Sequence, residues 1–174
     1  MALLVGSWLL TRAAQESVDK RGASCTRPLS DVLHDLLPDL SHMHHLIDAL
    51  PVVLGLLVLV FCGRVDLRRL VNQMTLVYLI RVITTSATVL PSPICSASRP
   101  SCRAVGGCHA CIFSGHTATT LLFAWHLQKC FPEYTYHLLA YSVLSSLLIV
   151  ATRSHYTIDV LVAWIVVHSL VMYA

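Results

Sequence analysis

Long apolar runs separated by short polar segments are the dominant pattern of this chain. Five of these runs approach the roughly 20 residues that a helix needs to cross a bilayer. They lie at 46–62, 70–90, 111–127, 137–151 and 160–174. Helices satisfy their own backbone hydrogen bonds, so they are the natural form for a membrane span. A sixth run, 2–10, is too short to span and has no basic residue before it, so we interpret it as a truncated first span.

The fold class predicted by this pattern is an all-α, polytopic transmembrane helix bundle. Residues 1–13 form the truncated first span, and residues 14–45 form a polar loop with one short amphipathic piece at 31–37. Residues 46–174 form the transmembrane core, with connections predicted at 63–69, 91–110, 128–136 and 151–154. The alternative is a soluble all-α protein with buried helices.

Composition strengthens the membrane interpretation. Of the 174 residues, 56% are hydrophobic and only 12% are charged, about half the charged fraction of a soluble domain. The mean hydropathy is +0.70. The net charge of +3 comes from scattered basic residues without interleaved aromatic ones, which argues against binding to nucleic acid.

Four of the seven cysteines crowd one predicted loop, at Cys95, Cys102, Cys108 and Cys111. Such crowding suggests disulfides in an oxidising lumen, although the pairing cannot be read from sequence. The alternative is a zinc site formed by the last three of these cysteines and His109, because Cys108-His-Ala-Cys111 has the two-residue gap of a zinc knuckle.

Two histidine motifs carry the candidate chemistry. Ser114-Gly-His116-Thr opens one predicted helix, and His155-Tyr-Thr-Ile-Asp159 opens another. The i, i+4 spacing places His155 and Asp159 on one helical face, where the carboxylate can hold the imidazole in one tautomer. If the helices alternate in direction, His116 and His155 begin helices at the same side of the membrane. Two histidines and an aspartate at one depth indicate a catalytic triad, with one histidine as nucleophile and the other as acid/base.

Arginine at membrane depth provides a candidate phosphate ligand. Arg81 lies on a polar stripe of one apolar run, and its guanidinium matches phosphate oxygens in a bidentate manner. A structural salt bridge to Asp48 or Asp159 is the alternative. Arg153, two residues before His155, is a second candidate for balancing a phosphate charge.

The motifs together resemble those of the sphingomyelin synthase family, which includes inositol phosphorylceramide and ceramide phosphoethanolamine synthases and is related to the lipid phosphate phosphatases. The two histidine motifs look like the catalytic signatures of that family. Pro28-Leu-Ser-Asp31 looks like its first motif, and Arg81-Val-Ile-Thr-Thr-Ser-Ala-Thr-Val-Leu-Pro91 is similar to its second. The four motifs occur in the family's order from about Pro28 to the end.

This resemblance implies six spans and a multi-pass protein of the Golgi, endoplasmic reticulum or plasma membrane, with a lumenal or exoplasmic active site. It implies transfer of a phosphorylated head group from a glycerophospholipid to the primary hydroxyl of ceramide, with release of diacylglycerol. The triad maps onto His116, His155 and Asp159. We expect His155 to be the nucleophile, because it has Asp159 one helical turn later, whereas His116 has Thr120 at the equivalent position. Phosphoryl transfer by positioning and charge needs no metal or cofactor here.

Two features of the chain depart from the pattern of that family. The family usually has Cys-Gly-Asp before its Ser-Gly-His-Thr, whereas this chain has Cys108-His-Ala110. The short first run suggests a fragment or a shortened member.

A lipid phosphate phosphatase is one alternative function, although Ser92 stands where that class has the lysine of its Lys-x6-Arg-Pro element. A catalytically inactive membrane protein of the same fold is the other.

Overall fold

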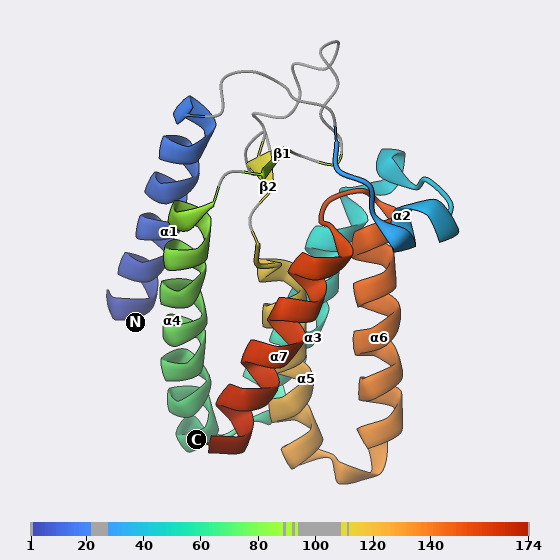
Figure 1. The fold of residues 1–174 in the computed structure, drawn as a ribbon. Helices are drawn as coiled ribbons and strands as arrows, with labels where there is room; N and C mark the ends of the chain where they lie inside the picture. Colours follow the sequence, from blue (N-terminus) through green and yellow to red (C-terminus); the bar gives the residue numbers. More distant parts are fainter. Residues whose placement is uncertain are drawn as a thin grey trace.

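Six long helices form a bundle in the computed structural model, which describes residues 2–21, 28–88, 90–91, 93, 109–110 and 112–173 (Figure 1). The predicted all-α class is confirmed. The long helices are α1 (Ala2–Arg21), α3 (Leu46–Phe61), α4 (Arg64–Ala87), α5 (Gly115–Cys130), α6 (Thr135–Ala151) and α7 (Thr157–Tyr173). The short elements are α2 (Val32–Leu36), the 3-10 turns Ser41–Met43 and Pro132–Tyr134, and the paired β1 (Leu90–Pro91) and β2 (His109–Ala110).

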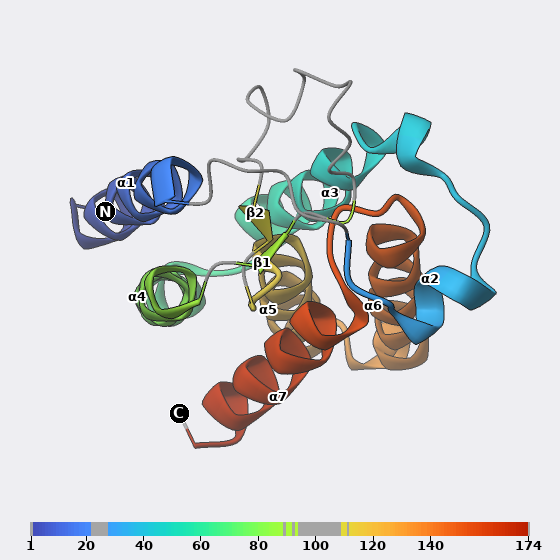
Figure 2. The ribbon, with the colours of Figure 1, turned by 45° about the horizontal axis from the view of Figure 1, so that its top comes forward.

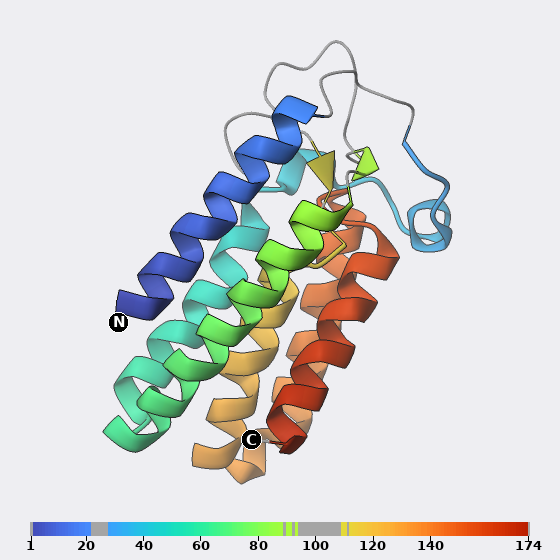
Figure 3. The same ribbon diagram turned by 60° about the vertical axis from the view of Figure 1, so that its left-hand side comes forward.

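The long helices alternate in direction along the chain, as Figures 1 and 3 show. The described parts of the 28–45 segment, the β1–β2 pair and the 152–156 turn therefore lie at one end of the bundle, which we call the site end. The 62–63 turn and the 131–134 connection lie at the opposite end, which we call the far end. The predicted shared face of His116 and His155 is thus confirmed at the level of the bundle.

Helix α5 occupies the centre of the bundle and packs against α3, α4, α6 and α7 (Figure 2). Most of its inward side chains are small or apolar, His126 is a buried polar exception, and Leu122 is fully buried, as is Phe113 just before the helix. Close approach of α3 depends on Gly55, because a Cβ there would lie 2.9 Å from Cε2 of Phe123 on α5. Helix α1 packs along α4 at the edge of the bundle.

The distribution of polar side chains is the reverse of that in a soluble protein. Large apolar side chains such as Leu56, Leu144 and Ile165 are exposed, whereas Gln73 and Asp159 are buried. Soluble domains seldom expose so much contiguous apolar surface. Within the described residues, one segment, Pro132–Ala151, is long and apolar enough to cross a membrane, and α3 and α7 are shorter apolar helices. The predicted count of five spans remains a prediction.

Two helix boundaries differ from those predicted. Helix α1 continues to Arg21, so residues 14–21 are helical rather than part of a loop. Its polar Gln15 is buried, and Thr11 Oγ1 donates to Ser7 O at 2.9 Å and Tyr78 O at 3.4 Å, so these polar positions face the bundle. Helix α4 begins at Arg64, so most of the predicted 63–69 connection is helical. Arginine and leucine are good helix formers, and a helix can extend beyond its apolar part.

Candidate active site

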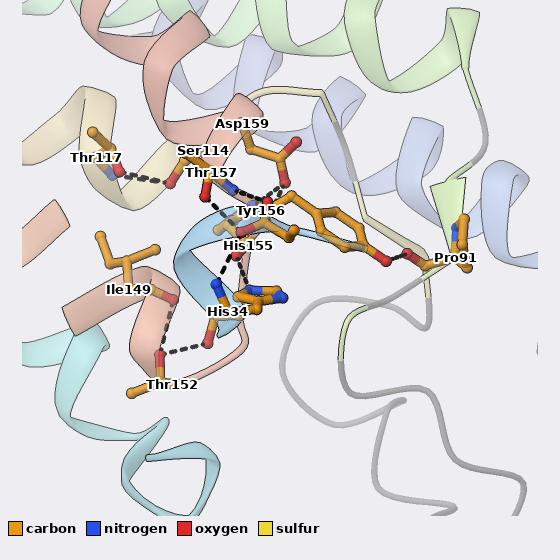
Figure 4. Close-up of polar contacts among 12 residues, drawn as sticks. His34, Pro91, Ser114, Thr117, Ile149, Thr152, His155, Tyr156, Thr157 and Asp159 are labelled. Atoms are coloured by element: carbon orange, nitrogen blue, oxygen red, sulfur yellow. Dashed lines mark hydrogen bonds and ion pairs between the residues drawn. The ribbon is translucent and has the colours of Figure 1, made fainter. Parts of the chain in front are cut away.

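The turn before α7 holds the pair that the i, i+4 spacing predicted. His155 Nδ1–H donates to Asp159 Oδ2 at 3.1 Å, and the backbone N–H of Tyr156 donates to the same oxygen at 3.0 Å (Figure 4). His155 lies just before α7 rather than within it, and the bond from Tyr156 makes Asp159 a cap of the helix start. Asp159 is 0% exposed and His155 is 7% exposed. The bond to Nδ1 leaves Nε2 of His155 as the nitrogen available for chemistry.

Ser114 starts α5 and joins it to α7. Its Oγ accepts hydrogen bonds from the N–H of Thr117 at 3.3 Å and from Thr117 Oγ1 at 2.9 Å, as an N-cap residue does. Its own backbone N–H donates to the carbonyl oxygen of Asp159 at 3.1 Å. This last bond fixes the beginnings of the two histidine-bearing helices against each other.

His116 also has a carboxylate partner, which sequence reasoning missed. Its Nε2–H donates to Asp48 Oδ1 at 2.8 Å. Asp48 lies in the first turn of α3, and its side chain is 52% exposed, while that of His116 is 30% exposed. Nδ1 of His116 is buried and has no partner among the described residues. The prediction that only His155 has a carboxylate partner is therefore wrong.

Arg81 lies directly over the start of α5. A Cβ added at Gly115 would be 1.7 Å from Arg81 Nη1 and 2.9 Å from Cζ, so only glycine leaves room for this guanidinium. Nε of Arg81 is buried without a partner, and in the described part of the chain no ion pair joins Arg81 to Asp48 or Asp159. The structural salt bridge considered from sequence is thus not the arrangement found.

The surroundings of His116 favour an anion. Arg81 and His155 both lie close enough to His116 to act on it electrostatically. The N–H groups at the beginning of α5 add the positive end of a helix dipole at the same place. A buried, unpaired guanidinium nitrogen beside two imidazoles and a helix N-terminus can neutralise the charge of a phosphate.

Arg153 has a different environment from Arg81. Its Nη2 donates to the carbonyl oxygens of His34 at 2.7 Å and Leu37 at 3.0 Å, where α2 ends. Its φ of 57° is unusual for a residue other than glycine, and it bends the turn so that the side chain reaches α2. Nη1 is buried without a partner in the described residues. Binding of phosphate by Arg153 stays a prediction, and the contacts observed are those of a helix cap.

The Pro28–Asp31 motif docks on the start of α7. Asp31 accepts from the Thr157 N–H at 2.8 Å, the Thr157 hydroxyl at 2.6 Å and the His34 N–H at 3.1 Å. Burial alone would raise the pKa of Asp31, but these hydrogen bonds outweigh it and lower the pKa. His34 Nε2–H donates to the His155 carbonyl oxygen at 3.1 Å (Figure 4). Asp31 and His34 therefore fix the backbone that carries His155.

Tyr156 fastens two more segments to the same turn. Its hydroxyl donates to the carbonyl oxygen of Pro91 at 2.9 Å and accepts from the N–H of Leu29 at 3.1 Å. Burial raises the pKa of this phenol. The ends of the first and second motifs thus meet at the residue that follows His155, which the sequence did not reveal.

The cysteine cluster lies outside the described residues. Cys95, Cys102, Cys108 and Cys111 belong to the undescribed part of the 91–111 segment, so neither the disulfides nor the zinc site is tested. In the described ranges, no three histidine, cysteine or acidic side chains are grouped as metal ligands.

The class of protein emerges from comparison with known families. Residues 107–174 match the model of the PAP2 superfamily C-terminal domain. The matched segment contains α5, α6 and α7, and with them His116, His155 and Asp159.

Particular relatives narrow the resemblance. The phosphatidylinositol:ceramide inositolphosphotransferase 3 of Arabidopsis thaliana is 41% identical over 69 residues, which are 38% of this chain and 24% of that protein. The phosphatidylinositol:ceramide inositolphosphotransferase of Oryza sativa subsp. japonica is 39% identical over 69 residues, 38% of this chain and 21% of that protein. The alignments thus span about a quarter of these relatives. Over this segment they confirm the predicted resemblance to a sphingomyelin synthase-like family related to the PAP2 superfamily.

Proposed function

We propose that this chain transfers a phosphorylated head group from a glycerophospholipid to the primary hydroxyl of ceramide, with diacylglycerol as the second product. The observation that carries the proposal is the buried His155–Asp159 pair, which lies at the same end of the bundle as His116 and as Arg81, whose buried Nε has no partner among the described residues. Phosphatidylinositol is the first donor to test, because the Arabidopsis and rice relatives are named for its use.

The reaction we propose has two displacement steps. Nε2 of His155 attacks the phosphorus of the donor lipid, and the bond from phosphorus to the diacylglycerol oxygen breaks while His116 supplies that oxygen with a proton. The phosphorus is then held on His155 as a phosphohistidine. His116 next takes the proton of the ceramide hydroxyl, whose oxygen attacks phosphorus and releases His155. Arg81 neutralises the phosphate charge in both steps.

Asp159 and Asp48 have different parts in this scheme. Asp159 is buried, so its charge acts on His155 with little screening by water. Asp48 is half exposed, which suits a group that orients His116 while that histidine gains and loses a proton. We retain His155 as the nucleophile on this difference in burial.

Trapping of the covalent intermediate tests the proposal. The protein in its membrane is given phosphatidylinositol labelled on phosphorus, without ceramide, and quenched in alkali, in which phosphohistidine survives. We expect label on the wild-type protein and none on His155→Ala. Label on His155→Ala but not on His116→Ala would reverse the roles, and an active preparation without any protein-bound label would exclude the covalent route.

The acceptor distinguishes this function from that of a lipid phosphate phosphatase, which the PAP2 match keeps as the second candidate. Labelled ceramide and several phospholipids are incubated with the membranes, and the products are separated. We expect a labelled phosphosphingolipid. Release of a free head-group phosphate that is independent of ceramide would favour the phosphatase, and no turnover of any donor would favour an inactive protein.

We also propose that the site end faces the lumen or the exterior. Cys102 and Cys108 lie in the sequence between β1 and β2, which pair at this end of the bundle. In sealed, reduced microsomes these thiols should react with an impermeant reagent only after the lumen is opened. Labelling of Cys102 or Cys108, located by peptide mapping, in intact microsomes would place the site on the cytosolic face.

A further inference from the structure

Two cysteines meet at the far end of the bundle, where the proposed reaction uses no residue. Cys62 follows the last residue of α3, and Cys130 is the last residue of α5. Their Sγ atoms lie 2.9 Å apart. A disulfide bond is about 2.05 Å long, so less than one ångström separates this contact from a covalent bond.

The backbone on both sides of the pair is ordered. The Cys62 N–H donates to the Val58 carbonyl oxygen at 2.8 Å, and the Phe131 N–H that follows Cys130 donates to Leu127 O at 2.8 Å. Phe61 and Phe131, the neighbours of the two cysteines, stack edge to face with ring centroids 5.4 Å apart. Each helix end is thus ordered by its own backbone bond, and the ring contact joins the two ends without sulfur.

We propose that Cys62 and Cys130 form a redox-sensitive disulfide that locks α3 to α5 at the far end. Both cysteines are partly exposed, so a small oxidant can approach them. The same two helices carry Asp48 and His116 at the site end. The disulfide would therefore cross-link the two helices that position Asp48 and His116.

The oxidant is a low-molecular-weight disulfide such as glutathione disulfide. One cysteine thiolate attacks it, a mixed disulfide forms and one glutathione thiolate leaves. The second cysteine thiolate then attacks the protein sulfur of the mixed disulfide and releases the second glutathione. Two protein thiols are oxidised to one disulfide, glutathione disulfide is reduced to two thiols, and the two protons pass to the departing glutathione.

Mass spectrometry of the full chain tests the bond directly. The protein in detergent is equilibrated with glutathione disulfide or with reduced glutathione, quenched with an alkylating reagent and digested without reduction. We expect a cross-linked peptide containing Cys62 and Cys130 in the oxidised sample and separate alkylated peptides in the reduced one. In Cys130→Ser, Cys62 should carry glutathione or the alkylating group in the oxidised sample, with no cross-linked peptide, and should be alkylated in the reduced sample. Complete alkylation of both cysteines in the oxidised wild type, or pairing of Cys62 with another cysteine, would overturn the proposal.

Thermal unfolding tests the lock between the helices. Cys62 and Cys130 are 68 positions apart in the chain. A disulfide that closes a loop of this length should raise the unfolding midpoint of the oxidised wild type by roughly 5–10 °C. The rise should disappear on reduction and be absent from Cys62→Ser and Cys130→Ser, which remove only one sulfur each. A cross-linked protein whose midpoint equals that of the reduced form would show that the bond forms without locking α3 to α5.

Discussion

Replacement of Asp159 by asparagine tests the division of labour between the two carboxylates. Asp159 is fully buried, and one of its oxygens, Oδ2, accepts both the His155 Nδ1–H and the Tyr156 N–H. An asparagine oxygen can occupy the same position and keep both bonds, and its amide nitrogen would then lie where Oδ1 now has no partner. The substitution therefore removes a negative charge and leaves the ring in place.

The size of the effect can be bracketed. A hydrogen bond to a charged group contributes about 1 kcal/mol more than a neutral one, which corresponds to a loss of roughly fivefold to tenfold in rate. If the amide turns so that its nitrogen faces His155, the wrong tautomer is favoured, and the loss is on the order of 10⁴ by analogy with serine proteases. We expect Asp159→Asn to fall between these limits.

Asp48→Asn is the matched control, because it makes the same chemical change at the other histidine. Asp48 is 52% exposed, and exposed ion pairs contribute about 0.2–1 kcal/mol, so the expected loss is at most roughly fivefold. Asp159→Asn should therefore cost more than Asp48→Asn.

The assay is transfer of label from a phospholipid to ceramide, at saturating donor, in membranes with equal amounts of folded protein. Gel filtration in detergent and the unfolding midpoint establish that both variants are folded. Equal losses in the two variants, or a larger loss in Asp48→Asn, would refute the reasoning from burial. The second result would make His116 the histidine that depends on a carboxylate, and with it the better candidate for the nucleophile.

Further predictions concern the residues that hold the phosphate site and the start of α7. Gly115→Ala places a Cβ 1.7 Å from Arg81 Nη1 and should raise the donor KM at least tenfold, whereas Gly6→Ala, with nothing within 4 Å, should leave it unchanged. Arg81→Lys keeps the charge but loses the planar fork, so donor affinity should fall while the unfolding midpoint changes little. Asp31→Asn should lower the unfolding midpoint, because Thr157 loses a charged acceptor. Since the pKa of Asp31 lies below its usual 3.8, its contribution is fully present above about pH 4 and is lost as the pH falls through the lowered pKa; the difference between wild type and Asp31→Asn should therefore shrink as the pH falls below about 4.

Local spacing predicted the parts of the site that lie close together in the chain. His155 and Asp159 are four positions apart, so any helix or turn that starts there brings them into contact. The glycine before His116 could be recognised as part of a motif. Its reason, the space that Arg81 occupies, depends on how α4 packs against α5 and appears only in the structure.

Contacts between distant segments could not be predicted in this way. Asp48 and His116 are 68 positions apart. Asp48 is an acidic residue in the first turn of an apolar helix, which indicates that it has a partner. The sequence does not identify that partner. The contacts of Arg153 were hidden for a different reason, because they depend on a turn with a positive φ, from which the side chain reaches α2.

The candidate site is formed by the N-terminal ends of helices, and a few hydrogen bonds between these ends position its side chains. The Ser114 N–H bond to the Asp159 carbonyl oxygen joins α5 to α7, and Asp31 joins α2 to α7 through Thr157. Each bond satisfies an N–H that a helix start would otherwise leave without a partner in an apolar environment. The polar groups that stabilise these helix ends are therefore the same groups that orient the histidines. A substitution such as Asp31→Ala should for this reason disturb the position of His155 and the stability of α7 together, even though Asp31 does not contact the proposed reacting atoms.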